Sequence, residues 1–253
     1  MQLNKTNEQA RAQALKIAEV AQMLWDKGWA EATSGNISLN VTSSYPNIHL
    51  DFRSSPMIHL DSRLPALANN YIFITAKGAR MRNLAQDPSS GLCLIKVSKK
   101  GDQYQVLFED QENPLEPSSE ILTHLTIHEK MVKAGNGNTA IVHAHVHELV
   151  VLTHDPALRS EARLNELLMG MHTETAFFLA EGIGYVPLVA PGSPELAKAN
   201  LKSLKDHTVV VWEKHGVMAI GKNVHDAFDR IDILAKAAGI YLAIRSLGLN
   251  FKV

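Results

Sequence analysis

Two hydrophobic periodicities run along this chain, one typical of helices and one typical of strands. Residues 8–27 repeat apolar side chains at helical spacing and stop before Gly28, and a second helical pattern begins after Asn223 and ends near Ser246. The apolar stripes are Leu15, Ala18, Ala21 and Trp25 in the first segment, and Phe228, Ile231, Ala235, Ala238 and Leu242 in the second. Both segments are predicted to be amphipathic helices.

Between these helices, short β-branched runs alternate with further helical patterns. Strands are predicted at 37–39, 71–74, 91–97, 103–109, 139–142, 185–189 and 209–212, with short strands and loops over 41–70 that include 48–50 and 57–60. Helices are predicted from 117 to about 133, at 146–153 and 164–180, and from 193 to 204. The order predicts an α/β sandwich over residues 1–253, one domain with a mixed, mainly antiparallel central sheet covered by helices.

Composition narrows the class of protein. The 253 residues are 45% hydrophobic and carry a net charge of −1, which provides no basic field for nucleic acid. The single cysteine, Cys93, has no internal disulfide partner and fits a reducing compartment. No apolar run approaches the roughly 20 residues that span a bilayer, and the N-terminus is polar. We expect a cytoplasmic protein that binds neither nucleic acid nor membrane.

The candidate chemistry is a set of three histidines. His143 and His145 end an apolar run, and alternation along a strand projects both to the same side. His215 follows the β-branched run 209–212, so a neighbouring strand ending there could bring a third imidazole to the same point. Three imidazoles with one open position are typical of catalytic zinc, and one cysteine excludes a thiolate-rich structural site.

A His-x-His pair alone is more often structural than metal-binding. His147 shares strand parity with the pair, but it lies where the strand should give way to a helix, and we interpret it as second-sphere or structural. The other histidines are interpreted as surface or core-edge residues: His49, His59, His124, His128, His154, His172, His207 and His225.

Five short motifs occur in an order that resembles the class II aldolase family. They are Ser34-Gly35-Asn36-Ile37-Ser38-Leu39, Ile74-Thr75-Ala76-Lys77-Gly78, Pro117-Ser118-Ser119-Glu120, His143-Ala144-His145 and Lys214-His215-Gly216-Val217. Residues 25–29 and 64–69, with the insertion at 41–70, resemble its rhamnulose-phosphate branch, although Ser34 stands where that branch often has glycine. The resemblance implies zinc-dependent, reversible cleavage of L-rhamnulose 1-phosphate to dihydroxyacetone phosphate and L-lactaldehyde. It also implies one Zn²⁺ per subunit and a homotetramer with sites near subunit interfaces.

The same resemblance assigns the catalytic groups. His143, His145 and His215 would hold the ion, which stabilises the negative charge of an enediolate as a Lewis acid. Glu120 is implied as the base and as a possible fourth zinc ligand in the resting enzyme. Without the resemblance, a glutamate at a helix start is more simply explained by the helix dipole. Glu174 matches a second acidic position, implied to deliver a proton across a subunit boundary, whereas a carboxylate on a helix is usually just solvated.

Three loops are candidates for holding the substrate phosphate. Ser118 and Ser119 precede a helix and offer hydroxyls and free backbone N–H groups. Gly35-Asn36 and Lys77-Gly78 resemble the family's two other phosphate loops, where small residues let the backbone approach the anion. Lys77 would contribute through its N–H, with some added attraction from its ammonium. Each loop alone is more often only a turn.

Three alternatives remain open from the sequence. A Schiff-base aldolase would need a desolvated lysine, for which Lys96 in the strand 91–97 is the candidate, but that leaves the histidines unexplained. A related aldolase or epimerase could use the same sites on another sugar phosphate, such as L-fuculose 1-phosphate. The third alternative is a non-catalytic interaction module on the same scaffold.

Overall fold

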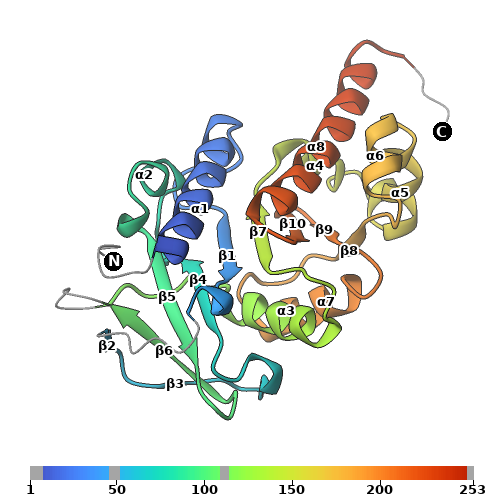
Figure 1. The fold of residues 1–253 in the computed structure, drawn as a ribbon. Helices are drawn as coiled ribbons and strands as arrows, with labels where there is room; N and C mark the ends of the chain where they lie inside the picture. The colour runs from blue at the N-terminus through green and yellow to red at the C-terminus, as the bar shows by residue number, and fades with distance from the viewer. Residues whose placement is uncertain (1–7, 46–51, 109–113, 250–253) are drawn as a thin grey trace.

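The computed structural model describes residues 8–45, 52–108 and 114–249, and its centre is one ten-stranded sheet (Figure 1). The strand order is β2-β6-β5-β4-β1-β7-β10-β9-β8, with β3 also paired to β6. The strands are β1 Asn36–Asn40, β2 Arg53–Ser54, β3 Ile58–His59, β4 Tyr71–Thr75, β5 Leu92–Val97, β6 Gln103–Phe108, β7 Ala140–Ala144, β8 Gly184–Val186, β9 Val209–Trp212 and β10 Gly216–Gly221. All pairs are antiparallel except β8 with β9, which confirms the mixed, mainly antiparallel sheet.

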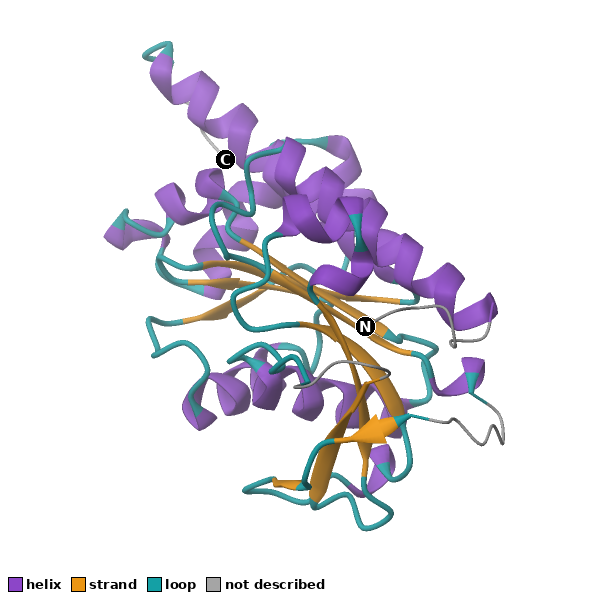
Figure 2. Ribbon diagram, turned by 90° about the vertical axis from the view of Figure 1, so that its left-hand side faces the viewer, coloured by secondary structure: helices purple, strands orange, loops and turns teal. Residues whose placement is uncertain are grey.

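Helices cover both faces of the sheet, as Figure 2 shows. They are α1 Glu8–Asp26, α2 Met81–Gln86, α3 Ile121–Ala134, α4 His147–Leu152, α5 Glu161–Met169, α6 Thr173–Phe178, α7 Pro194–Ser203 and α8 Val224–Ser246. The core on one face joins α1, α2, α4, α5 and α8 to the sheet, whereas α3 and α7 pack on the other face. None of these described helices is long and apolar enough to cross a membrane.

Side-chain alternation along β1 determines which groups meet α3. Ile37 and Leu39 belong to the core beneath α1 and α8, so Ser38 between them faces the α3 side. The same alternation along β7 turns Val142 toward the α8 side and Ile141 toward the α3 side. His143 has the parity of Ile141, and this places it on the face that α3 covers.

Most predicted elements are present, with several corrections. The segment 164–180 is not one helix but α5 and α6, interrupted at Gly170–His172, where glycine disfavours a continuous helix. Helix α2 and strand β10 were not predicted. In α1, Leu15 and Trp25 are exposed, and the buried stripe instead contains residues such as Ile17 and Leu24. The predicted strand at 48–50, with His49, lies outside the described residues.

Candidate active site

Strand β7 carries the first two histidines to one end of the sheet. His143 pairs with Asn36 of β1 on one side and with Met218 of β10 on the other, so it sits in the interior of the sheet. The backbone N–H of His145, just after the strand, donates to the carbonyl of Trp29. The two imidazole rings lie with their centroids 5.1 Å apart, as strand alternation predicted.

His215 reaches the same place on the turn between β9 and β10. The sequence prediction was wrong about the neighbouring strand, because β10, which starts after His215, pairs with β7 and separates it from β9. Lys214 adopts a left-handed conformation with φ of 57° in this turn. A Cβ at Gly216 would lie 2.3 Å from the carbonyl oxygen of Ala144, so only glycine permits the close approach of the two strands.

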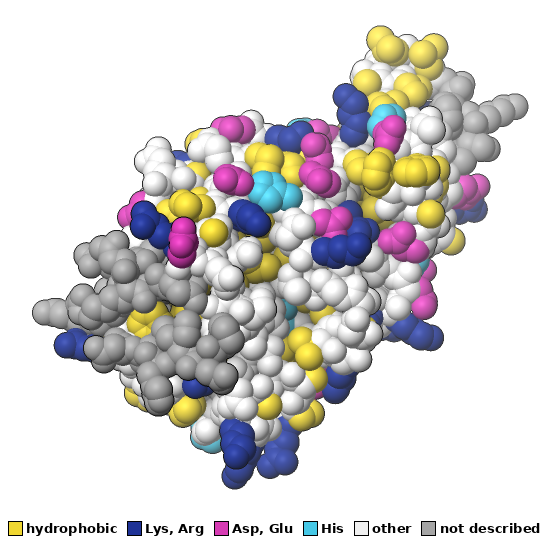
Figure 3. Space-filling view, viewed as in Figure 1, with side chains coloured by type: hydrophobic (Ala, Val, Ile, Leu, Met, Phe, Trp, Pro, Cys, Tyr) yellow, Lys and Arg dark blue, Asp and Glu magenta, His cyan; other side chains and the backbone are white. Residues whose placement is uncertain are grey.

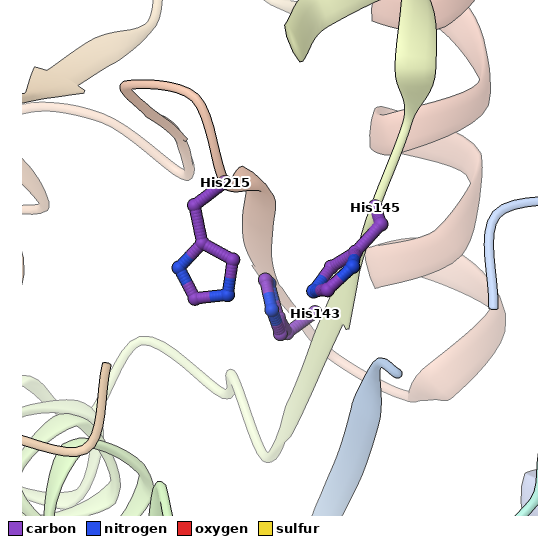
Figure 4. A group of neighbouring side chains, drawn as sticks. All are labelled: His143, His145 and His215. Atoms are coloured by element: carbon purple, nitrogen blue, oxygen red, sulfur yellow. The ribbon is translucent and has the colours of Figure 1, made fainter. Parts of the chain in front are cut away.

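The three imidazoles form a nearly regular triangle (Figure 4). The ring centroid of His215 is 4.9 Å from that of His143 and 5.0 Å from that of His145. One ring nitrogen from each residue lies within 4.8 Å of the other two. The indole of Trp212 stacks on His143 with a centroid distance of 4.4 Å and holds that ring in place.

Hydrogen bonds to the outer nitrogens leave the inner nitrogens free as metal ligands. Nδ1–H of His143 donates to the carbonyl of Val217 at 2.9 Å, and Nδ1–H of His145 donates to Oε1 of Glu31 at 2.9 Å. The Nε2 of His143 is buried and has no hydrogen-bond partner among the described residues. A buried lone pair without a donor is costly unless a ligand uses it, so the residues present fit a divalent cation.

Burial keeps the imidazoles of His143 and His215 neutral, as metal ligands must be. Burial, with the nearby His145, lowers the pKa of His143 to about 3, and burial with the nearby His143 lowers the pKa of His215 to about 4. Neutral imidazoles present lone pairs at neutral pH, and metal binding then needs no proton release from either residue.

Glu31 is a candidate site residue that the sequence analysis did not identify. Its carboxylate orients His145 across 114 positions of sequence and also accepts a hydrogen bond from Ser34 Oγ at 3.0 Å. Burial alone would raise the pKa of Glu31, but hydrogen bonds from His145, from its own backbone and from Ser34 outweigh it and the pKa is lowered. Ser34 therefore supports the carboxylate behind His145.

Glu120 lies directly beside the histidine triangle. It is the residue before α3, and its side chain does not cap that helix, so the simple helix-dipole explanation does not account for its orientation. Its Oε2 is 3.9 Å from His143 Nε2, and its Oε1 is 3.8 Å from His215 Nε2. The side chain is buried, and Oε2 accepts a hydrogen bond from the amide of Asn36 at 2.9 Å. Glu120 is thus within reach of a shared cation and of a substrate bound to it.

The structure brings two of the predicted phosphate loops together beside Glu120. Ala76 forms a β-bridge with Pro117, which joins the loop containing Lys77 and Gly78 to the segment containing Ser118 and Ser119. The backbone N–H of Lys77 already donates to Glu116, and its ammonium pairs with the Glu116 carboxylate at 3.2 Å. Its N–H is therefore not available to an anion, contrary to the prediction for this atom.

The remaining loop atoms differ in what they offer. Ser118 is buried, and its Oγ accepts from the N–H of Glu120 at 3.3 Å. Ser119 is exposed, and among the described residues no partner bonds to its N–H or to that of Gly78. Gly35 has φ of 76°, and a Cβ there would meet the carbonyl oxygen of His143 at 3.0 Å, so this glycine serves a close approach to β7.

Three other candidates lie apart from the triangle. Glu174 is in the first turn of α6, a helix that packs chiefly on α8 and α5. His147 begins α4, as predicted for the point where the strand ends, and its side chain is 73% exposed and pairs with Glu148. Lys96 on β5 holds its ammonium 5.1 Å from the ring centroid of Tyr71, and two strands separate β5 from β7. It is not placed to act with the histidines.

Two histidines interpreted as peripheral are in fact fully buried. His124 and His128 lie on the inward face of α3 and contact Ser38 of β1. The interpretation was wrong for these two because α3 packs its histidine face on a sheet face that contains a serine. Burial lowers the pKa of His124 well below its ordinary value and that of His128 to about 3.

Comparison with known proteins identifies the family. Residues 15–242 match the family described as Class II Aldolase and Adducin N-terminal domain. This chain belongs to that family. It is 36% identical to the rhamnulose-1-phosphate aldolase of Bacteroides thetaiotaomicron over 93% of this chain and 87% of that protein. It is 32% identical to the enzyme of the same name from Listeria welshimeri, over 94% of this chain and 85% of the relative.

Solved structures agree with the assignment. A sugar-phosphate aldolase from Thermotoga maritima superposes with a TM-score of 0.81 at 33% identity, covering 96% of this chain and 98% of the other. An L-fuculose 1-phosphate aldolase superposes with a TM-score of 0.65 at 18% identity, over 99% of this chain and 93% of the other. The second likeness concerns the fold alone. The predicted fold class and the resemblance to class II aldolases are confirmed.

Proposed function

We propose that this chain is a class II, zinc-dependent aldolase that reversibly cleaves L-rhamnulose 1-phosphate to dihydroxyacetone phosphate and L-lactaldehyde. The observation that carries the proposal is the triangle of His143, His145 and His215 with the Glu120 carboxylate beside it. The likeness to curated rhamnulose-1-phosphate aldolases over nearly the whole chain supports this substrate. An interaction module on the same scaffold would not require neutral, oriented imidazoles.

The residues around the triangle have distinct roles in the proposed reaction. In the synthetic direction, a proton leaves the hydroxymethyl carbon beside the ketone of dihydroxyacetone phosphate and an electron pair moves to the ketone oxygen. Glu120 is the carboxylate placed to take that proton. A bound divalent cation supplies stabilisation of the negative charge that develops on oxygen. Because Glu120 is buried beside the ion site, little water competes for the proton.

The substrate phosphate would bind between the joined loops. The free N–H groups of Gly78 and Ser119 and the Ser119 hydroxyl can donate to phosphate oxygens. Lys77 would add only the long-range attraction of its ammonium, which the Glu116 carboxylate already partly neutralises. On the face shown in Figure 3, Lys and Arg side chains are interspersed with Asp and Glu over much of the upper half.

Zn²⁺ is the ion we propose, one per subunit, since three imidazoles with an open position suit catalytic zinc. We also propose a homotetramer in which Glu174 serves the site of a neighbouring subunit. In support, Phe177 and Phe178 on the same short helix are 77% and 52% exposed, and a subunit contact would remove this apolar surface from water. Light scattering of the purified protein measures the assembly state.

The function is tested by incubating the protein with a panel of ketose 1-phosphates, with and without EDTA. We expect L-rhamnulose 1-phosphate to be cleaved fastest, L-fuculose 1-phosphate more slowly, and all cleavage to stop with the chelator and return with Zn²⁺. His145→Ala should lose both zinc and turnover. Activity that persists in EDTA and is trapped by borohydride would instead indicate a Schiff base, and faster cleavage of another ketose phosphate would reassign the substrate.

A further inference from the structure

A chain of buried polar side chains runs from Glu120 into the space between β1 and α3. Asn36 Nδ2 donates to Glu120 Oε2 at 2.9 Å, and His124 Nε2 hydrogen-bonds to the carbonyl oxygen of the same amide. Ser38 Oγ lies 2.6 Å from His124 Nδ1 and 2.8 Å from His128 Nε2. All five side chains are buried, and three of them are completely inaccessible to solvent. The proposed reaction does not yet use His124, Ser38 or His128.

The donor and the acceptor of every hydrogen bond between these five side chains follow from Glu120, the first of them. An ionised carboxylate only accepts, so Asn36 must present its amino group to Glu120 and its carbonyl to His124. Nε2 of His124 must then carry the proton, since a carbonyl oxygen also only accepts. A neutral imidazole carries one proton, so Nδ1 of His124 accepts from the Ser38 hydroxyl.

The hydrogen-bond chain ends at Nδ1 of His128. Ser38 donates its only hydroxyl proton to His124, and therefore accepts from Nε2–H of His128. Nδ1 of His128 is left as a buried acceptor with no partner among the described residues. Burial keeps both imidazoles neutral, because it lowers the pKa of each. Every hydrogen bond in the chain thus donates toward Glu120.

We propose that His124, held by Ser38 and His128, is a positioning residue that fixes the amide of Asn36 with its amino group toward the base Glu120. The inference rests on the proposed function. Without a donor at His124, the amide of Asn36 could rotate and turn its carbonyl toward the carboxylate. Two acceptors would then face each other, and the carboxylate would lose a charge-assisted hydrogen bond.

Asn36 thus gains a role beside the phosphate contact that its motif implied. One N–H of its side-chain amide donates to the base and the amide carbonyl accepts from His124, which leaves the second N–H of the amino group for a substrate. Loss of this hydrogen-bond chain should slow proton abstraction and leave the affinity for a phosphorylated substrate nearly unchanged. A split between kcat and KM distinguishes positioning of the base from binding of the substrate.

The first test measures proton abstraction directly. Dihydroxyacetone phosphate alone is incubated with the zinc-loaded protein in D₂O, and exchange of its hydroxymethyl proton is followed by NMR. His124→Met should lower the exchange rate by at least about tenfold, as loss of a hydrogen bond to a charged group predicts, with KM and zinc content unchanged. His124→Gln keeps a donor near the Nε2 position and should restore most of the rate.

Two further variants control for the folding of α3. Thr123→Val changes a neighbouring, completely buried side chain on the same helix, whose hydroxyl has no partner among the described residues, and should leave exchange unchanged. Ser38→Ala breaks the chain one step further from Glu120 and should slow exchange about threefold to tenfold. Wild-type exchange in His124→Met, or in Ser38→Ala if the methionine variant does not fold, would overturn the proposal. If His124→Met lost zinc and His124→Gln did not bind it again, the hydrogen-bonded side chains would have only a structural role, and the proposal would likewise be overturned.

A second test does not depend on activity. Nitrogen chemical shifts of the imidazoles distinguish the two neutral tautomers, and we expect His124 and His128 both to carry the proton on Nε2. A proton on Nδ1 of His124 would reverse the chain and refute the inference, whatever reaction the protein catalyses. Correct tautomers in a protein that neither exchanges dihydroxyacetone phosphate nor cleaves a ketose phosphate would instead show that the proposed function is wrong.

Discussion

The carboxylate of Glu31 should strengthen metal binding without touching the metal. It accepts the Nδ1–H of His145 at 2.9 Å, which leaves Nε2 of that ring directed toward the other two histidines. His143 needs no such side chain, because the backbone carbonyl of Val217 performs the same task. Substitution of Glu31 therefore changes what orients His145 without removing any of the three imidazoles.

The size of the effect follows from the geometry and the exposure of the pair. Loss of such an outer partner typically weakens metal affinity by 10–100-fold. The Glu31 side chain is 62% exposed, and solvent screens its charge, so we expect the lower end for Glu31→Ala: about tenfold, or about 1.4 kcal/mol. Glu31→Gln keeps an acceptor for Nδ1–H and loses only the charge, so it should weaken binding by only about threefold.

The assay is competition for Zn²⁺ between the protein and a chromophoric chelator at neutral pH. Glu19→Ala is a matched control, because Glu19 pairs with His225 at 3.0 Å and its side chain is 61% exposed, while neither residue belongs to the triangle. The control should bind Zn²⁺ like the wild type. Equal affinity in Glu31→Ala, or the same loss in Glu19→Ala, would show that the hydrogen bond to His145 does not orient a ligand.

Further predictions concern the base, the loop beside it and the buried histidines. Glu120→Gln should retain zinc in metal analysis but lose at least about 100-fold in turnover, since an amide takes no proton; full activity would remove Glu120 as the base. Gly35→Ala should lower Tm more than Gly28→Ala, because both glycines have positive φ but only Gly35 would bring a Cβ against a carbonyl, at 3.0 Å; equal losses would show that the contact is harmless. Burial lowers the pKa of His128 to about 3, so the unfolded chain takes up a proton below about pH 6.5 while the folded protein does not. The contribution of His128 to the free energy of unfolding should therefore fall by up to about 1.4 kcal/mol per pH unit as the pH drops from about 6.5 toward 3. Urea unfolding of the wild type and of His128→Phe over this pH range measures that contribution. A difference between the two proteins that did not change with pH would contradict the prediction.

The sequence predicted that His143 and His145 lie together because the pattern that places them is local. An apolar strand followed by His-x-His fixes two imidazoles on one side of one strand, and the structure places His143 and His145 accordingly. The contact between His145 and Glu31 could not be predicted in this way, since it joins residues 114 positions apart and nothing in the local pattern marks it. Such partners become visible only when the sheet is assembled.

Other errors concern residues and elements whose surroundings depend on the assembled fold. His124 and His128 were grouped with the surface and core-edge histidines, yet both are buried against Ser38, a polar residue within an otherwise apolar strand. The strand β10 escaped prediction although all six of its residues are buried, so the sequence paired His215 with the wrong strand. The helical pattern of 164–180 continued through Gly170, where the structure ends α5.

The triangle joins parts of the chain that are remote in sequence, and this has a consequence for stability. An ion held by His143, His145 and His215 would tie the end of β7 to the turn that leads from β9 into β10. Such a tie acts as a removable cross-link, because the unfolded chain cannot present the three rings together. Zinc binding would then protect the whole right-hand half of the sheet in Figure 1 from thermal opening, to an extent that grows with the free ion concentration.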